Sequence, residues 1–81
     1  MNRMHLYQEA ITMKGRRYGS FPEVFEWRGR DYRVRIVERC WTMTMGDGTR
    51  FRFRVRCSEG IFSLSYHPAT DRWYIENVAA D

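Results

Sequence analysis

The sequence predicts an all-β fold, a small antiparallel meander that closes into an SH3-like or OB-like barrel. Short runs rich in Val, Ile, Thr, Tyr, Phe and Trp recur between glycine-bearing breaks, and helical periodicity is nearly absent. Apolar residues make up 43% of the chain and aromatic residues 16%, which is enough to build a core despite 30% charged residues. A chain of 81 residues cannot build two separate cores, so residues 1–81 are expected to form one domain.

Six strands are expected, each bounded by a turn with glycine, proline or polar residues. Their ranges are Leu6–Met13, Glu23–Arg28, Asp31–Met45, Thr49–Cys57, Ile61–Tyr66 and Trp73–Asn77. The core barrel therefore covers residues 6–77, and residues 78–81 are expected to fray. The segment Lys14–Pro22 contains two arginines and two glycines, and it is expected to form a basic loop between the first two strands.

The first hairpin turn is placed by the register that keeps apolar residues on one face, because a one-residue shift exposes a strand's whole apolar set. A turn at Gly29-Arg30 meets this condition and pairs opposite charges on the outer face. A turn at Arg28-Gly29 would instead oppose the carboxylates of Glu26 and Asp31, and we reject it for that reason.

The second hairpin is expected to turn through a three-residue loop at residues 46–48, with Gly48 in a left-handed bulge. This register pairs Trp41 with Phe53 and places Met43 beside them in the core. The rival two-residue turn would set Trp41 and Met43 among arginines, and we reject it. The remaining turns are placed at Glu59-Gly60 and at Pro68–Asp71.

The long third strand changes parity between Ile36 and Arg39, because its inner set shifts there from even to odd positions. A bulge or bend in this segment would restore the alternation. The strand could then pair early with the second strand and late with the fourth. Such bending is typical of a small barrel, which the first strand would close.

Basic residues outnumber acidic residues by 14 to 10, for a net charge of +4, and Lys14 is the only lysine among them. Guanidinium groups suit phosphate, carboxylate and aromatic partners better than an ammonium group does. No stretch is long and apolar enough for a membrane span, and the first residues lack the apolar region of a signal peptide. We therefore expect a cytoplasmic protein without a membrane partner.

Catalytic and metal-binding residues are sparse. Cys40 and Cys57 show no zinc spacing, and the register places Cys40 outward and Cys57 inward, so no intrachain disulfide is expected. A cysteine nucleophile would need a base such as His67, and no histidine is expected within reach of either thiol. No nucleotide-binding or metal-binding motif is present. The sequence therefore predicts no enzyme, no catalytic residue, no metal and no cofactor.

The segment Thr49–Arg56 alternates arginine with apolar residues, so one strand projects a row of cations. Alternate strand residues lie about 6.6 to 6.8 Å apart, close to the spacing of successive phosphates along a nucleic acid. Serine and threonine side chains of neighbouring strands are expected beside this row, and Tyr74 provides a base-stacking position. The predicted nucleic-acid-binding residues are Arg50, Arg52, Arg54 and Tyr74, with Arg33, Arg35, Arg16 and Arg17 as extensions.

The run Phe25-x-Trp27-Arg28-Gly29-Arg30-x-Tyr32-x-Val34, with the later arginine-rich strand and Arg72-Trp73-Tyr74, resembles a family of small bacterial β domains. Members of that family are encoded near, or joined to, Y-family translesion DNA polymerases. The likeness covers residues 21–77. It implies a role close to DNA repair and a repair polymerase as a protein partner, and it assigns no function to individual residues.

Two functions follow from these observations. The first is a non-enzymatic accessory module that contacts the backbone of DNA or RNA through its arginine-rich strand. The alternative is a protein-interaction adaptor or homodimer that uses a sheet edge or the Lys14–Pro22 segment, where Tyr18 and Phe21 are candidate contacts. In that case the arginines serve only as a solvated face that keeps the sheet soluble.

Overall fold

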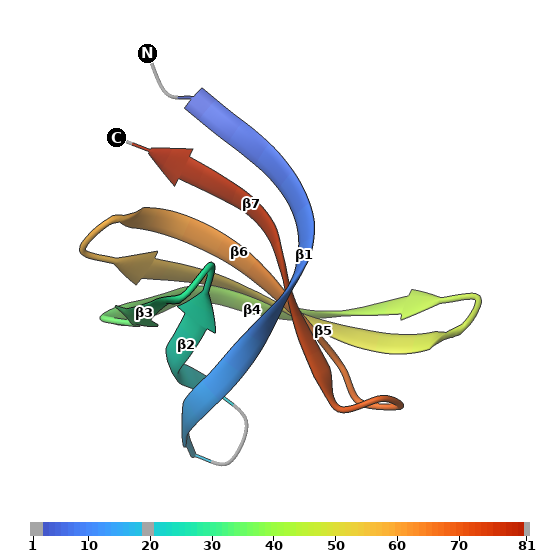
Figure 1. The fold of residues 1–81 in the computed structure, drawn as a ribbon. Coiled ribbons are helices and arrows are strands. Elements are labelled where there is room, and N and C mark those ends of the chain that lie inside the picture. Colours follow the sequence, from blue (N-terminus) through green and yellow to red (C-terminus); the bar gives the residue numbers. More distant parts are fainter. Residues whose placement is uncertain (1–2, 19–20, 81) are drawn as a thin grey trace.

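The computed structural model describes residues 3–18 and 21–80, which form seven antiparallel strands in one strongly twisted sheet (Figure 1). The strands are β1 (Arg3–Arg17), β2 (Phe21–Trp27), β3 (Arg30–Arg33), β4 (Ile36–Met45), β5 (Gly48–Cys57), β6 (Gly60–His67) and β7 (Arg72–Ala80). Their order across the sheet is β3-β2-β1-β7-β6-β5-β4. The all-β antiparallel meander that the sequence predicts is confirmed.

The two edge strands of this sheet, β3 and β4, are consecutive in the chain. At the bend between them, the Val34 amide donates to the Glu23 carbonyl and the Arg35 amide donates to the Arg56 carbonyl, each at 2.8 Å. One bent segment thus pairs first with β2 and then with β5, as predicted, and β1 lies between β2 and β7. The sheet itself is not closed, because no ladder joins β3 to β4 within the described residues.

A bulge lies in the expected segment of β4, but the parity beyond it is opposite to the prediction, because the inner set moves from Val37 back to even positions such as Cys40. Val37 pairs with Val55 and Arg39 with Arg54, so the register shifts at Glu38. Val37 therefore packs against the core, while Arg39 faces the same side as the arginines of β5.

The core lies on the inner face of the twisted sheet. Phe53, Val55 and Cys57 of β5 are buried there, which confirms that the apolar residues between the arginines point inward. Phe25 and Phe62 are also buried, and their rings meet edge to face with centroids 5.6 Å apart. The other buried apolar residues are Ile11, Trp27, Tyr32, Val34, Leu64, Trp73 and Ile75.

The first hairpin turns at Arg28-Gly29, the position that we rejected from the sequence, and Glu26 does oppose Asp31. The repulsion is offset by Lys14 of the neighbouring β1, whose Nζ lies 3.5 Å from Glu26 and 3.0 Å from Asp31. Arg28 and Gly29 both take positive φ, 55° and 76°, as the favoured two-residue hairpin turn with two left-handed residues requires. The prediction failed because it compared only the two strands of the hairpin.

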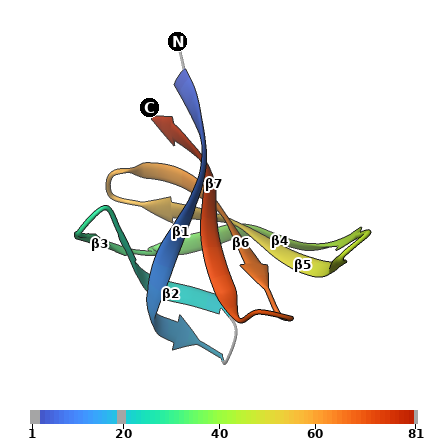
Figure 2. The same cartoon turned by 45° about the vertical axis from the view of Figure 1, so that its right-hand side comes forward.

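The second hairpin also has the register that we rejected, with Met45 paired to Gly48 across a two-residue turn. Trp41 consequently lies opposite Arg52 and leaves the core. The tip of the β4–β5 hairpin projects away from the rest of the sheet in both views (Figures 1 and 2). Neither of its faces is covered there, so burial does not fix the register at the tip.

The later turns and strand ends differ in part from the predictions. The β6–β7 register is confirmed, with Tyr66 opposite Trp73, whereas β5 and β6 turn at Ser58-Glu59, one residue earlier than expected. Strand β7 continues to Ala80, so residues 78–80 are paired rather than frayed, and residue 81 lies outside the described residues. Most of the expected basic loop belongs to β1 and β2, and its residues 19–20 also lie outside the described residues.

Candidate nucleic-acid interface

The outer face of β5 and its neighbours carries the predicted arginine row. Across the strands, the register places Trp41 of β4, Arg52 of β5, Ser65 of β6 and Tyr74 of β7 in one line. We call this surface the arginine face and define it by these residues together with Arg39, Met43, Arg50, Arg54, Ser63 and His67. The structure thus brings Arg50, Arg52, Arg54 and Tyr74 together as predicted. Thr42 and Thr44, which were expected beside the row, have the opposite parity from Trp41 and point to the other side.

Guanidinium groups cover the apolar side chains that the β4 register places here. The Arg39 guanidinium carbon lies 4.7 Å from the centre of the Trp41 ring. Arg52 Nη1 donates to Met43 Sδ at 3.4 Å, and Arg52 Nε is buried without a hydrogen-bond partner. These contacts explain how Trp41 and Met43 remain half-buried on a basic surface.

Carboxylates neutralise part of the arginine face. Glu38 lies 3.5 Å from Arg54 and 2.8 Å from Arg56, and Asp47 lies 2.9 Å from Arg50. Ion pairs with such exposed members contribute little to stability and exchange partners easily. A phosphate group could therefore replace Asp47 or Glu38 at modest cost.

The β6–β7 side of the arginine face is aromatic and shallowly hollowed. The rings of His67 and Tyr74 lie 4.6 Å apart, centre to centre. Burial, with a smaller effect of the nearby Arg50 charge, lowers the pKa of His67 below its usual value. A hollow of about 350 Å³ is lined by these three residues together with Gln8 and Glu76.

Ser65 anchors the middle of the arginine face. Its side chain is buried, with 0% exposed, and its hydroxyl donates to Glu76 Oε1 at 2.9 Å. This bond occupies one carboxylate oxygen of Glu76, the acidic residue closest to Tyr74 in the sequence. The serine is therefore part of the platform that holds the neighbouring side chains, and its hydroxyl proton is not available to a ligand.

The four extensions of the predicted site do not belong to the arginine face. Arg16 lies over the inner-face rings of Tyr66 and Trp73, 5.4 and 5.8 Å from their centres, and its guanidinium is 3.3 Å from Asp71. The remaining three extensions have other surroundings. Arg17 pairs with Glu23 at 2.6 Å, Arg33 lies on edge strand β3, and Arg35 donates to Ser58 at 3.1 Å.

Four residues of this surface were not assigned to it from the sequence, and they are Arg39, Trp41, Met43 and His67. Trp41 was expected in the core, and only a two-residue turn at Gly46-Asp47 would have indicated its true side. His67 was considered as a turn residue and a weak base. Its position next to Tyr74 follows from the β6–β7 register, which was predicted correctly.

The two thiols do not form a reactive pair. Cys40 lies opposite Phe53, so it shares the inner face with Cys57, and the expected opposite orientation is wrong. Both cysteines are free. Burial raises the pKa of Cys57 to about 12, and partial burial also raises the pKa of Cys40. Arg54 lies opposite Arg39 and on the other face of the sheet from Cys40.

Comparisons with known proteins give no relative, because no protein-family model, curated protein or solved structure matches this chain. The described residues contain no group of three or more His, Cys, Asp or Glu side chains that could hold a metal ion. In the same part of the chain, no helix has the length and apolar character needed to cross a membrane.

Proposed function

We propose that the protein is a non-enzymatic, cytoplasmic module that binds single-stranded nucleic acid through the arginine face, without reading base identity. Arg50, Arg52 and Arg54 would contact the phosphates, and Trp41 and Tyr74 would stack on bases. The resemblance to domains found near translesion polymerases is consistent with such an accessory role.

One observation carries the proposal, namely that Trp41 and Tyr74 lie on the same row across the sheet as Arg52. Three strand spacings separate the two aromatic residues, which amounts to about 14 Å. Cations that follow a backbone, with aromatic rings on which bases stack, are the usual elements of sequence-independent binding to single strands. Bases in a duplex are already stacked, so aromatic platforms favour a single strand.

A salt titration tests the phosphate contacts. Binding of a fluorescein-labelled 12-nucleotide oligothymidylate would be followed by anisotropy over a range of salt concentrations. Each lost phosphate contact lowers the slope of log affinity against log salt by about 0.7, so the Arg50→Gln/Arg52→Gln/Arg54→Gln variant should lose about 2 from the slope.

A matched variant separates this site from the effect of net charge. Arg30→Gln/Arg33→Gln/Arg35→Gln removes the same charge outside the arginine face. We expect it to keep nearly the wild-type slope. An equal loss of slope in both variants would show that binding follows net charge alone, and the site assignment would then be wrong.

Trp41 supplies a direct optical readout, because the other tryptophans, Trp27 and Trp73, are only 8% and 3% exposed. Stacking of a base on Trp41 should quench its fluorescence as oligothymidylate is added. Trp41→Phe should bind somewhat more weakly and lose the quenching, while the far-ultraviolet circular dichroism stays unchanged. Quenching of the same size in Trp41→Phe would contradict the assigned stacking position.

A second candidate function, protein interaction at a sheet edge, is favoured by one separate observation. Within the described residues, the edge strand β4 has no ladder partner on the side away from β5. This edge lies next to two hollows, and Trp41 is the residue of the arginine face that lines one of them.

A further inference from the structure

The open part of the sheet is a seam between the start of β2 and strand β4. Strand β3 covers β2 only from Val24 to Trp27, so the segment 21–23 lacks a ladder partner on that side. Among the described residues, β4 has a ladder with β5 alone. The amide of Val34 crosses the top of the seam to the Glu23 carbonyl. Below that bond, no backbone hydrogen bond joins β2 to β4 within the described residues.

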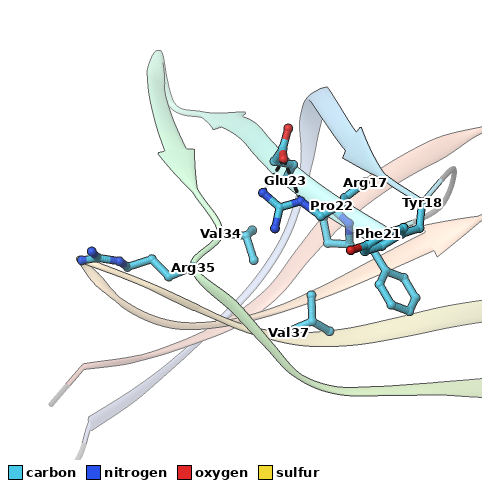
Figure 3. Close-up of a pocket in the computed structure, with 8 residues that line it drawn as sticks. All are labelled: Arg17, Tyr18, Phe21, Pro22, Glu23, Val34, Arg35 and Val37. Carbon is cyan, nitrogen blue, oxygen red and sulfur yellow. Dashed lines mark hydrogen bonds and ion pairs between the residues drawn. The ribbon is translucent and has the colours of Figure 1, made fainter.

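Two hollows open into this seam, one on each side of Phe21. The first, of about 190 Å³, lies between residues 17–18 and 21–23 at the β1–β2 end and residues 34–37 at the β3–β4 bend (Figure 3). The second, of about 260 Å³, is lined by Phe21, the segment 40–42 of β4 and the inner-face rings of Phe51, Phe53 and Tyr66. The second hollow is mainly apolar and suits an aromatic or aliphatic side chain.

Apolar side chains that a folded chain usually covers are exposed around the seam. Tyr18 is 85% exposed and takes a positive φ of 56°, and its ring lies 6.4 Å from that of Phe21. Phe21 is 37% exposed although it packs edge to face on Phe53 at 6.0 Å. Ile36 at the start of β4 is 55% exposed. Exposed apolar groups beside an open strand edge are typical of a protein-interaction site.

The charged side chains around the seam determine which net charge a bound segment should carry. Arg35 extends away from the first hollow, and it bonds to the Ser58 hydroxyl rather than to a carboxylate in the described part of the chain (Figure 3). Arg39 follows on β4 itself, while Arg17 is paired with Glu23 at 2.6 Å. A second copy of the chain would bring its own Arg35 and Arg39 to this edge, and the like charges would oppose self-pairing. An acidic segment would be attracted.

We propose that the seam binds an extended, acidic segment of a protein partner as an added β-strand. The segment would pair with the open edge of β4, place one aromatic or aliphatic side chain in the hollow at residues 40–42, and present a carboxylate to Arg35. Main-chain hydrogen bonds then supply affinity, and the hollow and Arg35 supply selectivity, as in other cases of strand addition.

A designed probe tests this proposal on the full chain. The probe is the N-acetylated, C-amidated octapeptide Thr-Phe-Thr-Val-Thr-Val-Thr-Asp, in which five residues lie between the phenylalanine and the aspartate. Titration into ¹⁵N-labelled protein should shift amide signals of residues 21–23 and 34–42 and leave those of β7 unchanged. A control peptide with proline in place of both valines cannot pair as a strand and should bind much more weakly. Equal binding of the proline peptide, or shifts that lie elsewhere, would overturn the proposal.

A charge exchange tests the role of Arg35. Arg35→Glu should weaken binding of the aspartate probe about fivefold, as expected for one exposed charge contact, and should strengthen binding of the same peptide ending in lysine. Arg50→Gln/Arg52→Gln/Arg54→Gln should bind the aspartate probe like the wild type, which separates this site from the arginine face. Sedimentation equilibrium that shows a stable dimer, disrupted by Arg35→Glu, would instead identify a second copy as the occupant and overturn the proposal.

Discussion

Glu26 and Asp31 face each other across the first hairpin, and the Lys14 ammonium group of the adjacent strand lies within 3.5 Å of both carboxylates. The hydrogen bond and charge of Asp31, with a smaller effect of Glu26, raise the pKa of Lys14 above its usual value. The turn at Arg28-Gly29 is therefore stabilised by a residue outside its own hairpin.

Removal of this cation should destabilise the hairpin. We expect Lys14→Met to lower the thermal midpoint by a few degrees at low salt, because Glu26 and Asp31 would then repel each other without compensation, and by less at high salt. Asp31→Asn in the Lys14→Met background should recover part of the loss. Circular dichroism melting at two salt concentrations measures both effects, and an unchanged midpoint for Lys14→Met would contradict the role of the lysine.

Substitution by alanine at two turn glycines should change the free energy of unfolding in opposite directions. Gly29 has a φ of +76°, so Gly29→Ala should lower the free energy of unfolding by about 1 kcal/mol even though a Cβ would meet nothing within 4 Å. Gly46 has the same open surroundings without positive φ, and Gly46→Ala should be neutral or stabilise by about 0.5 kcal/mol. Urea unfolding of the two variants checks the difference, and equal losses would show that the first turn has another conformation.

Glu9 should account for part of the acid sensitivity of the fold. The carboxylate accepts hydrogen bonds from Arg28 Nε and Nη2, at 2.9 and 2.6 Å, and from Trp27 Nε1 at 2.9 Å. The Arg28 bonds, followed by the Trp27 bond, lower the pKa of Glu9 from 4.5 to about 2. Because the folded pKa is depressed, the stabilisation is fully present above pH 4.5 and is lost as the pH falls toward 2.

The variant Glu9→Gln isolates this contribution. It should be less stable than the wild type at neutral pH, and its stability should change less between pH 4.5 and pH 2. Glu59→Gln removes a carboxylate that lies 3.5 Å from Arg30, a looser ion pair, and serves as the matched control. Across this pH range, the urea unfolding midpoint of Glu59→Gln should show the wild-type pH dependence, and that of Glu9→Gln should not. A wild-type pH dependence in Glu9→Gln would rule out the assigned cause.

The two cysteines should differ in reactivity toward a thiol reagent at pH 8. Cys40 is exposed, whereas Cys57 is 5% exposed and burial raises its pKa to about 12. One thiol should therefore react quickly in the native protein and the other only after unfolding. Cys40→Ser should abolish the fast reaction and Cys57→Ser should leave it intact. Two fast thiols in the wild type would show that the inner face opens readily.

The hairpin register that the sequence predicts correctly is that of β6–β7, in which both strands contribute to the core. Tyr66 and Trp73 pair as expected, because a one-residue slip would expose the neighbouring Leu64 and Ile75. The alternation of apolar residues predicts the wrong register at the β4–β5 tip, because the tip extends past the core. Trp41 was expected in the core, and it packs under Arg39 on the outer face. The alternation also fails at the β2–β3 turn, where Lys14 comes from a strand that the hairpin sequence does not contain.

The same distinction applies to the candidate site. The sequence correctly predicts that one face of the sheet carries Arg50, Arg52, Arg54 and Tyr74. The alternation of side chains along β5 and the β6–β7 register place them there. The four extensions of the predicted site, at positions 16, 17, 33 and 35, were added to it only because of their charge and their position in the sequence. Arg16 lies elsewhere because its partners are the rings of Tyr66 and Trp73 and the carboxylate of Asp71, which lies 55 positions along the chain.

The pairing of Arg3 with Ala80 brings the two ends of the described chain side by side, on the same corner of the sheet (Figure 2). A short linker could join them, and new ends could be opened at the Gly46-Asp47 turn, giving a circularly permuted protein with every strand retained. For the same reason, the whole unit could be inserted into a surface loop of a host protein, with little separation imposed on the two host ends.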